Sequence, residues 1–467
     1  MKRLKIRLNI LLLLVIFLST KILAQTKNEF TVKQAVDYGI KNATAVKNAL
    51  IDIQIQKQTN REITAAALPQ LNASATGTHF FNIAVQSLPN FIAPSTYQVL
   101  VQEGVKDAAG NPIKFPAGGF GNIAAQFGVP WTVNAGVDFS QLLFDGQVFV
   151  GLQARSAAMQ LATKTAEVTA EQIKANIYKI YYQIAVGKKQ ATSIDANIER
   201  FEKLFKDTKE IYKQGFAEKL DVDKVEVQLN NIKTEKIKID NQLESANAGL
   251  KFLMNMPQKE VLILTDTVSE ASLKENILDD KYDYNNRKEI QLLTLASKLG
   301  EYNIKRYKLS KLPTVAAFGT YQKNAQRNEF DFFGKGPWFT TSLLGVKVSA
   351  PLFDGFARKA KIEKASLELQ KTKNDIAQFK ENIDFDVNSA NIKMKNAILT
   401  IDNQKQNLTL AEKVYNTTKK KYEAGLGSNQ EIYNAQTEFK VAETNYYSAM
   451  YDAVIAKIDF LKAVGKL

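Results

Sequence analysis

The chain has no cysteine and only one histidine in 467 residues. Without cysteine it can form no disulfide framework, offers no thiolate nucleophile and has no thiol to carry a lipid anchor. The histidine, His79, stands in a run of small residues and is more typical of a strand or loop position than of a catalyst. The sequence also contains no phosphate-binding loop, metal-ligand motif or nucleophile motif. We therefore expect neither an enzyme nor a bound cofactor or metal.

Acidic residues are fewer than basic ones, 48 against 62, and the formal net charge is +14. Part of this excess lies in residues 1–24, where four basic residues precede the apolar run 8–18 and Lys21 follows it. This pattern, ending at Ala24, predicts a secretory signal peptide, because Lys21 keeps the run below the ~20 apolar residues of a spanning helix. Its removal lowers the charge to +9, and the remaining lysines alternate with acids as on solvated helix faces. We expect an exported protein without a nucleic-acid partner.

Proline is rare, ten residues in all, and it is absent from residues 145–211 and 354–420. Each of these stretches would form a helix of ~100 Å. Each also begins with a copy of one junction, Asp145-Gly146 in the first and Asp354-Gly355 in the second. The copies lie 209 positions apart, and we expect each to connect a strand directly to a helix.

Further anchors show that the whole chain is duplicated. Gly215 recurs as Gly425 after 210 positions, whereas Asn42 recurs as Asn286 after 244. The first copy is therefore longer, and the extra length lies between Pro69 and the junction at residue 145. Residues 81–130, which hold five of the ten prolines, are expected to form a long outer loop with some structure of its own.

Apolar and polar residues alternate immediately before each junction. The alternation predicts half-buried strands at residues 132–143 and 341–352, each long enough to span a bilayer core of ~30 Å at the usual barrel tilt. Asp138 and Lys347 hold equivalent polar positions in these strands, so we expect both to face the lumen of a barrel. A register error of one residue would instead place these charges in lipid.

Both tryptophans follow a proline just before these strands, as Trp131 and Trp338. Aromatic residues at strand ends are typical of the interface between a bilayer and water. One such tryptophan would be equally typical of an ordinary loop, but the duplicated placement favours an aromatic girdle.

Helical segments flank the strands in each copy. Residues 31–67 and 284–311 predict one helix each, and residues 219–254 and 428–464 carry apolar seams at the 3/4 spacing of coiled coils. Because each long helix needs a partner of ~100 Å, the two shorter helices of a copy should stack end to end against it.

The expected fold is an α+β membrane protein built from a duplicated helix–strand–strand–helix unit. The division is a signal peptide at 1–24, a first repeat at 25–254, a small mixed element at 255–283 and a second repeat at 284–467. Four strands cannot close a barrel, and open sheet edges are not tolerated in lipid. The strands are therefore expected to join an oligomeric β-barrel, with the helices forming a long helical barrel.

Four motifs follow one another in order along the chain. They are Leu68-Pro69-Gln70-Leu71 with Leu312-Pro313, Leu143-Phe144-Asp145-Gly146 with Leu352-Phe353-Asp354-Gly355, Tyr212-x-x-Gly215 with Tyr422-x-x-Gly425, and Asn286-Arg287-x-Glu289. With these motifs the sequence resembles the TolC-type outer-membrane efflux family over essentially the whole mature chain. It departs from the family pattern at Ala43 and Lys288, which stand where that pattern has proline.

This resemblance implies a homotrimer in the outer membrane of a Gram-negative bacterium, in contact with its lipid and extending into the periplasm. It implies an exit duct that passively conducts small molecules from an inner-membrane pump and a periplasmic adaptor. Two alternatives remain, a type I secretion duct for peptides or proteins and a structural trimeric coiled-coil protein. The alternating strands flanked by tryptophan argue against the structural protein.

The glycines Gly215 and Gly425 interrupt the helical pattern and are expected to turn the chain at the tip furthest from the membrane. By resemblance, an acid such as Glu431 could help to form the constriction ring of a periplasmic entrance. Ser428-x-x-Glu431 is also a capping box, in which the glutamate only bonds the start of a helix. The entrance candidates are Tyr212, Asp221, Tyr422 and Glu431.

Overall fold

The computed structural model describes residues 27–274 and 282–467. The predicted signal peptide, residues 1–24, and residues 275–281 of the predicted mixed element lie outside this part. The chain divides into two compact units. Among the described residues, the helical unit comprises residues 27–59, 154–274, 282–303 and 364–467, and the sheet unit comprises Asn60–Gln153 and Ile304–Glu363.

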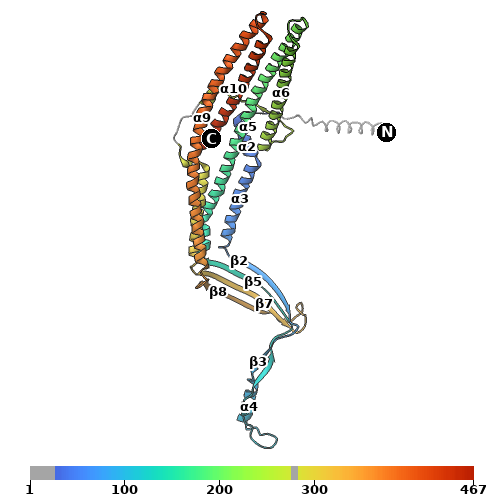
Figure 1. Ribbon diagram of the computed structural model, residues 1–467. Helices are drawn as coiled ribbons and strands as arrows, with labels where there is room; N and C mark the ends of the chain where they lie inside the picture. Colours follow the sequence, from blue (N-terminus) through green and yellow to red (C-terminus); the bar gives the residue numbers. More distant parts are fainter. Residues whose placement is uncertain (1–26, 275–281) are drawn as a thin grey trace, which may run out of the picture. The chain divides into compact units, whose positions relative to one another are not determined.

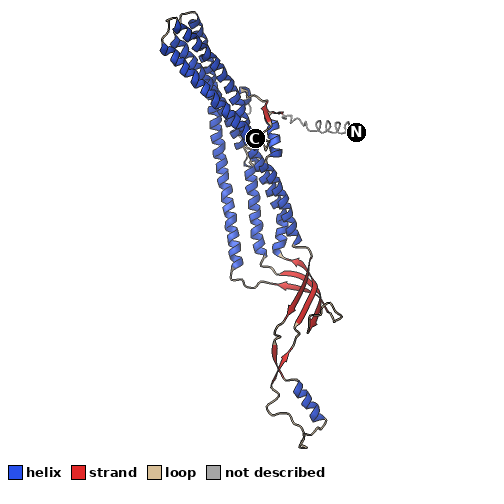
Figure 2. Ribbon diagram, turned by 90° about the vertical axis from the view of Figure 1, so that its right-hand side faces the viewer, coloured by secondary structure: helices blue, strands red, loops and turns tan. Residues whose placement is uncertain are grey.

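The sheet unit contains one four-stranded antiparallel sheet, drawn in red in Figure 2. Its strand order is β2-β5-β7-β8. Its strands are β2 (Gln70–His79), β5 (Trp131–Phe144), β7 (Thr314–Arg327) and β8 (Phe339–Ser349). β5 confirms the strand predicted at 132–143. β8 ends earlier than the predicted 341–352, because Pro351 has no N–H to donate to a ladder.

Residues 81–130, predicted as a loop with some structure of its own, contain three short elements. These are β3 (Val85–Pro89), α4 (Ile92–Gln102) and β4 (Asn122–Gln126), with β3 and β4 paired antiparallel. Tyr97 and Phe115 pack around Phe120, with ring centroids 5.1 and 5.9 Å from it. This small aromatic cluster holds α4 against the chain that follows it.

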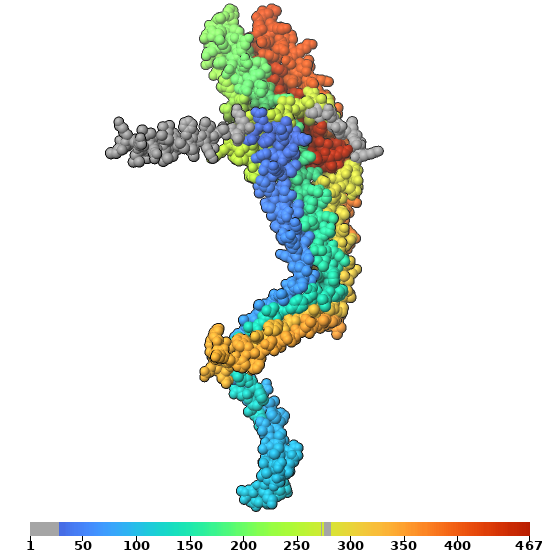
Figure 3. Space-filling view, turned by 180° about the vertical axis from the view of Figure 1, so that it is seen from behind, coloured from blue at the N-terminus to red at the C-terminus, as the bar shows by residue number. Residues whose placement is uncertain are grey.

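Two helical hairpins form most of the helical unit (Figure 1). One joins α5 (Gly146–Lys213) to α6 (Lys219–Leu253), and the other joins α9 (Ala357–Glu423) to α10 (Asn429–Ala463). The two long helices have 68 and 67 residues, as their freedom from proline predicted. One buried cluster contains side chains from all four helices, so the two hairpins pack side by side (Figure 3).

The single helix predicted at residues 31–67 is wrong, because the structure has α2 (Val32–Asn42) and α3 (Thr44–Ala65). Ala43, between them, has an extended ψ of 129°, and Arg287 has a ψ of 119° before α8 (Lys288–Leu309). Ala43 favours helix intrinsically, but tertiary contacts override that preference at this point. The side chain of Asn255, just beyond α6, donates to the carbonyl of residue 42 at 3.2 Å.

Residues 284–311 were likewise predicted as one helix, which is wrong at its start. A single turn, η1 (Tyr284–Asn286), precedes the break at Arg287. Arg287 donates to the carbonyl of Ala463, the last residue of α10. In both repeats a break in the chain therefore meets the end of the returning helix, as end-to-end stacking predicted.

A small parallel pair of strands, β1 (Lys27–Phe30) and β6 (Val261–Leu264), packs beside α5, and α7 (Glu270–Lys274) follows. The hydroxyl of Tyr181, a fully buried α5 residue, donates to the carbonyl of Phe30 at 2.8 Å. It also accepts from the amide of Asp266 at 3.0 Å. One tyrosine thus ties both ends of this small element to the long helix.

Candidate functional site

The four-stranded sheet has a mostly polar face on which Asp138 and Lys347 both lie. The register pairs Asp138 with Thr320, Thr320 with Leu343, and Lys347 with Ala316, which puts both charges on one side. The hydroxyl of Thr320 donates to Asp138 at 2.8 Å. Asn134 and Asn324 form a further hydrogen bond across the same face. Their shared side agrees with the predicted alternation, and their role in a lumen remains a prediction.

The opposite side, which we name the apolar face, carries small and apolar side chains. Both tryptophans lie at the end of this face that is remote from the helix junctions. The ring of Trp131 lies 4.1 Å from that of His79 and 5.0 Å from that of Phe330, measured between centroids. Members of the face include Leu71, Ala73, Ala75, Val133, Ala135, Val137, Phe139, Tyr321, Leu344, Val346 and Val348.

The first junction connects strand to helix directly. Asp145 follows the last residue of β5 and accepts hydrogen bonds from the amides of Gln147, at 2.7 Å, and Val148, at 3.3 Å. These bonds satisfy free N–H groups at the start of α5. Gly146 is required by space, because a Cβ there would lie 2.7 Å from the carbonyl oxygen of Leu309.

The second junction differs from the direct connection that was predicted. Residues 350–356 separate β8 from α9, and Gly355 and Phe356 both have positive φ angles, 62° and 67°. Asp354 still serves the helix start, since it accepts from the amide of Arg358 at 3.0 Å and pairs with its guanidinium at 2.9 Å. The shared Asp-Gly therefore caps both long helices through different backbone paths.

Both hairpins end in the same turn. The amides of Gly215 and Gly425 each donate to a tyrosine carbonyl at 3.0 Å, from Tyr212 and Tyr422. The next amide in each turn reaches one residue further back, which completes the Schellman pattern. The two glycines have φ angles of 81° and 74°, a conformation that favours glycine. The predicted turns at these positions are thus present.

The two tyrosines differ in their surroundings. Tyr212 is exposed, whereas the half-buried Tyr422 donates from its hydroxyl to Asn429 at 2.7 Å. Loss of solvent on burial raises the pKa of Tyr422. Tyr422 therefore braces its turn as a neutral hydrogen-bond donor.

The two entrance acids are also held differently. The hydroxyl of Ser428 accepts from the amide of Glu431 at 3.2 Å. The carboxylate of Glu431 does not accept from the amide of Ser428 in return, and it lies 3.7 Å from the ammonium of Lys421. The predicted capping box is therefore only half formed in the second repeat. In the first repeat, the carboxylate of Asp221 does accept from the amide of the N-cap residue, Glu218, at 3.4 Å.

A polar network that sequence reasoning missed lies between α5 and α10. The carboxylate of Glu443 accepts from Arg200 at 2.9 Å and from Asn197 at 2.7 Å. The guanidinium of Arg200 also stacks over the ring of Phe439, 4.7 Å from its centroid. No signal marks these residues in the sequence, because charged residues at this spacing usually form solvated helix faces.

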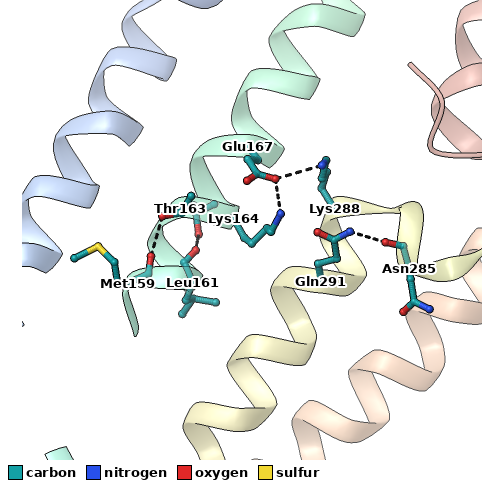
Figure 4. Close-up of polar contacts among 9 residues, drawn as sticks. Met159, Leu161, Thr163, Lys164, Glu167, Asn285, Lys288 and Gln291 are labelled. Atoms are coloured by element: carbon teal, nitrogen blue, oxygen red, sulfur yellow. Dashed lines mark hydrogen bonds and ion pairs between the residues drawn. The ribbon is translucent and has the colours of Figure 1, made fainter. Parts of the chain in front are cut away.

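A second missed contact explains a departure from the family pattern. Lys288 lies 3.3 Å from the carboxylate of Glu167 on α5, which also pairs with Lys164 at 2.6 Å (Figure 4). The hydrogen bond from Lys164 is the main reason why the pKa of Glu167 is lowered. Lys288 thus supplies an ion pair between α8 and α5 at a position where proline was expected.

Within residues 27–274 and 282–467, no helix is long and apolar enough to cross a membrane. The same residues contain no group of three or more His, Asp or Glu side chains arranged to hold a metal ion.

Comparison with known proteins finds similarity to outer-membrane proteins. Residues 284–466 match the family described as outer membrane efflux protein. The chain is 18% identical to the outer membrane protein TolC of Vibrio cholerae over 337 residues, which cover 72% of this chain and 77% of that protein.

Solved structures show the same fold. The chain superposes on CusC with a TM-score of 0.73 and 15% identity, covering 93% of this chain and 91% of that one. For the CmeC outer membrane channel of Campylobacter jejuni, the TM-score is 0.71 at 14% identity, with 93% and 85% covered.

Proposed function

We propose, from the premise that the chain belongs to the outer membrane efflux protein family, that it forms a passive exit duct for small molecules. In this proposal an inner-membrane pump and a periplasmic adaptor deliver the molecules, and the sheets of several copies form the pore through the outer membrane. The helices extend the duct into the periplasm.

The observation that carries the proposal is the two-faced sheet with open edges. Its order leaves β2 and β8 with one strand partner each, and one face is mostly polar while the other is apolar. An open edge cannot face lipid, because its backbone groups would stay without hydrogen bonds. Pairing β8 of one copy with β2 of the next satisfies both edges, and a trimer would close a barrel of twelve strands around the polar face.

The helical unit offers a second surface that fits an assembly. Apolar residues Phe385, Ile392 and Leu399 are exposed on α9, while Met394 on the same helix is fully buried. At ~100° per residue the three exposed side chains lie roughly 140–180° around the helix from Met394. A helix with two opposite apolar sides packs against neighbours on both, as in a helical barrel.

The hairpin tips fit the docking of an adaptor. Phe216 and Leu426 follow the two turn glycines, and they are 82% and 78% exposed. Large apolar side chains at the end of a solvated hairpin are typical of a contact surface for another protein. The proposal therefore places the adaptor at these tips.

Cysteine labelling tests the pore. The natural chain has no cysteine, so Asp138→Cys, Lys347→Cys and Phe139→Cys each introduce a single thiol. In intact outer membranes we expect a charged, water-soluble maleimide to label the first two within minutes and to leave the third unlabelled, because lipid excludes the reagent. Labelling only at residue 139 would reverse the assignment of the two faces.

The charge of Glu431 is expected to influence ion selectivity at the entrance. Ser428 caps α10 without help from the Glu431 carboxylate, so Glu431→Gln keeps the cap and removes one negative charge per chain. We expect the cation-to-anion permeability ratio to fall about twofold, a modest change because the Lys421 pair is exposed and screened.

The measurement is the reversal potential of single channels in planar bilayers under a salt gradient. Asp221→Asn serves as the matched control in the first repeat, since its carboxylate bonds the backbone of its own helix start. An unchanged reversal potential for Glu431→Gln would place the selectivity of the channel elsewhere.

A further inference from the structure

The apolar face of the sheet contains a groove with an unusual floor and one lysine. The groove has a volume of about 780 Å³, within the range of small-molecule sites. Three alanines on β2 and β5, Ala73, Ala75 and Ala135, form its floor. Tyr321 and Trp338 form bulky walls, so the depth arises from small side chains beside large aromatic ones.

The loop between β7 and β8 is built to hold Trp338 at this groove. Arg327, the last residue of β7, donates to the carbonyls of Pro337 at 2.8 Å and Asp331 at 3.2 Å. A Cβ on Gly336 would lie 2.5 Å from the guanidinium, so a larger residue there would displace Arg327 from these hydrogen bonds. The tryptophan wall is therefore a fixed part of the sheet unit.

Lys323 is the one charged residue that lines the groove. Within the described part of the chain, no carboxylate forms an ion pair with its ammonium. Across the four strands, the apolar face carries two charged side chains, Lys323 and Arg327, both basic, and no acid. The nearest acids in sequence, Glu329 and Asp331, lie beyond the end of β7.

The ammonium of Lys323 lies on the headgroup side of the bilayer midplane if this face meets the bilayer and Trp131 marks the interface. It pairs with Ala135, four residues from Trp131, which corresponds to ~13 Å along the strand. A lysine on the lipid-facing side costs up to ~2–4 kcal/mol at the bilayer midplane and much less near the interface. Its aliphatic stem can follow the apolar surface while the ammonium extends toward the level of the aromatic residues, where a headgroup phosphate can meet it.

We propose that this groove binds a phosphate-bearing anionic lipid, with its acyl chain on the alanine floor and its phosphate on Lys323. The proposal rests on the proposed function, because it requires the apolar face to meet lipid. The occupant follows from charge complementarity, since an unpaired cation on a face without acids matches an anionic headgroup. The apolar floor distinguishes such a lipid from free phosphate.

Native mass spectrometry of the full-length mature protein in detergent tests the site. The probes are phosphatidylglycerol and phosphatidylcholine with identical acyl chains, and we expect the anionic lipid to bind about tenfold more tightly. Lys323→Gln should remove this preference, and Lys323→Arg should keep it. Ala135→Leu, which fills the floor, should weaken the binding of both lipids severalfold.

Lys347→Gln is the matched control, because it removes a lysine from the opposite face of the same sheet. It should leave the lipid preference unchanged, and an equal loss would show that charge acts from anywhere in the sheet. Equal binding of both lipids to the natural protein would also overturn the proposal, as would displacement of the lipid by equimolar inorganic phosphate. If these results accompany normal channel conductance, the lipid site fails while the proposed function stands.

Discussion

The double variant Phe385→Asp with Leu399→Asp is expected to abolish the proposed trimer and leave separate, helical monomers. Both side chains lie on the exposed side of α9, opposite its buried seam, and are 72% and 63% exposed in the single chain. Burying each against a neighbouring copy contributes ~2 kcal/mol at each interface, and placing a carboxylate there costs more. Summed over three interfaces, the loss exceeds ~12 kcal/mol per trimer.

Size-exclusion chromatography with light scattering in detergent measures this change directly. Thr400→Asp is the control, since it adds one carboxylate at an exposed position one residue from Leu399, about 100° around the helix. The control should remain trimeric. A double variant that stays trimeric would show that the exposed side of α9 faces solvent in the assembly, and the oligomer would then depend on the sheet edges alone.

Periodicity made the long elements predictable. β5 and α5 follow from alternation and from the absence of proline, since each rule concerns a backbone pattern that neighbouring segments reinforce. The tip turns follow from Gly215 and Gly425, because few other residues adopt their positive φ angles. These features depend on local chemistry that one sequence displays.

Contacts between distant segments were not predictable. The break at Ala43 arises where α6 ends against it, and alanine itself favours the helix. The path of the second junction depends on Phe356, whose positive φ is uncommon for an aromatic residue. The local sequence marks neither the contact of α6 with the break at Ala43 nor the positive φ of Phe356.

Side-chain partners were the least predictable part of the candidate site. Glu431 fits a capping-box pattern, yet its carboxylate lies beside Lys421 at the end of the preceding helix. Glu443 and Arg200 resemble residues of a solvated face, but their side chains are only 14% and 21% exposed. Which of many charged residues meets a partner depends on how the helices pack, and a single sequence does not display this.

The polar network of Glu443, Arg200 and Asn197 supports the second prediction. Glu443→Ala is expected to lower the thermal midpoint of the helical signal by several degrees, because Arg200 and Asn197 both lose their acceptor in a largely buried place. Removing one partner of a buried pair typically costs ~3–5 kcal/mol, and the partial exposure of this pair reduces the expected loss to ~2–3 kcal/mol. Circular dichroism at the helical minimum of the detergent-solubilised protein measures the transition.

A double variant separates the value of the pair from the penalty for an orphaned charge. Replacing a buried ion pair by apolar residues of similar size is often neutral. Arg200→Met with Glu443→Leu should therefore recover most of the lost stability, since methionine can still pack against Phe439, on which the guanidinium stacks. Lys233→Met with Glu202→Leu, at an exposed pair joining α5 and α6, is the control and should change the midpoint little. If the apolar double variant at 200 and 443 is as unstable as Glu443→Ala, the network itself stabilises the contact between α5 and α10, and its carboxylate is required for the hairpins to pack.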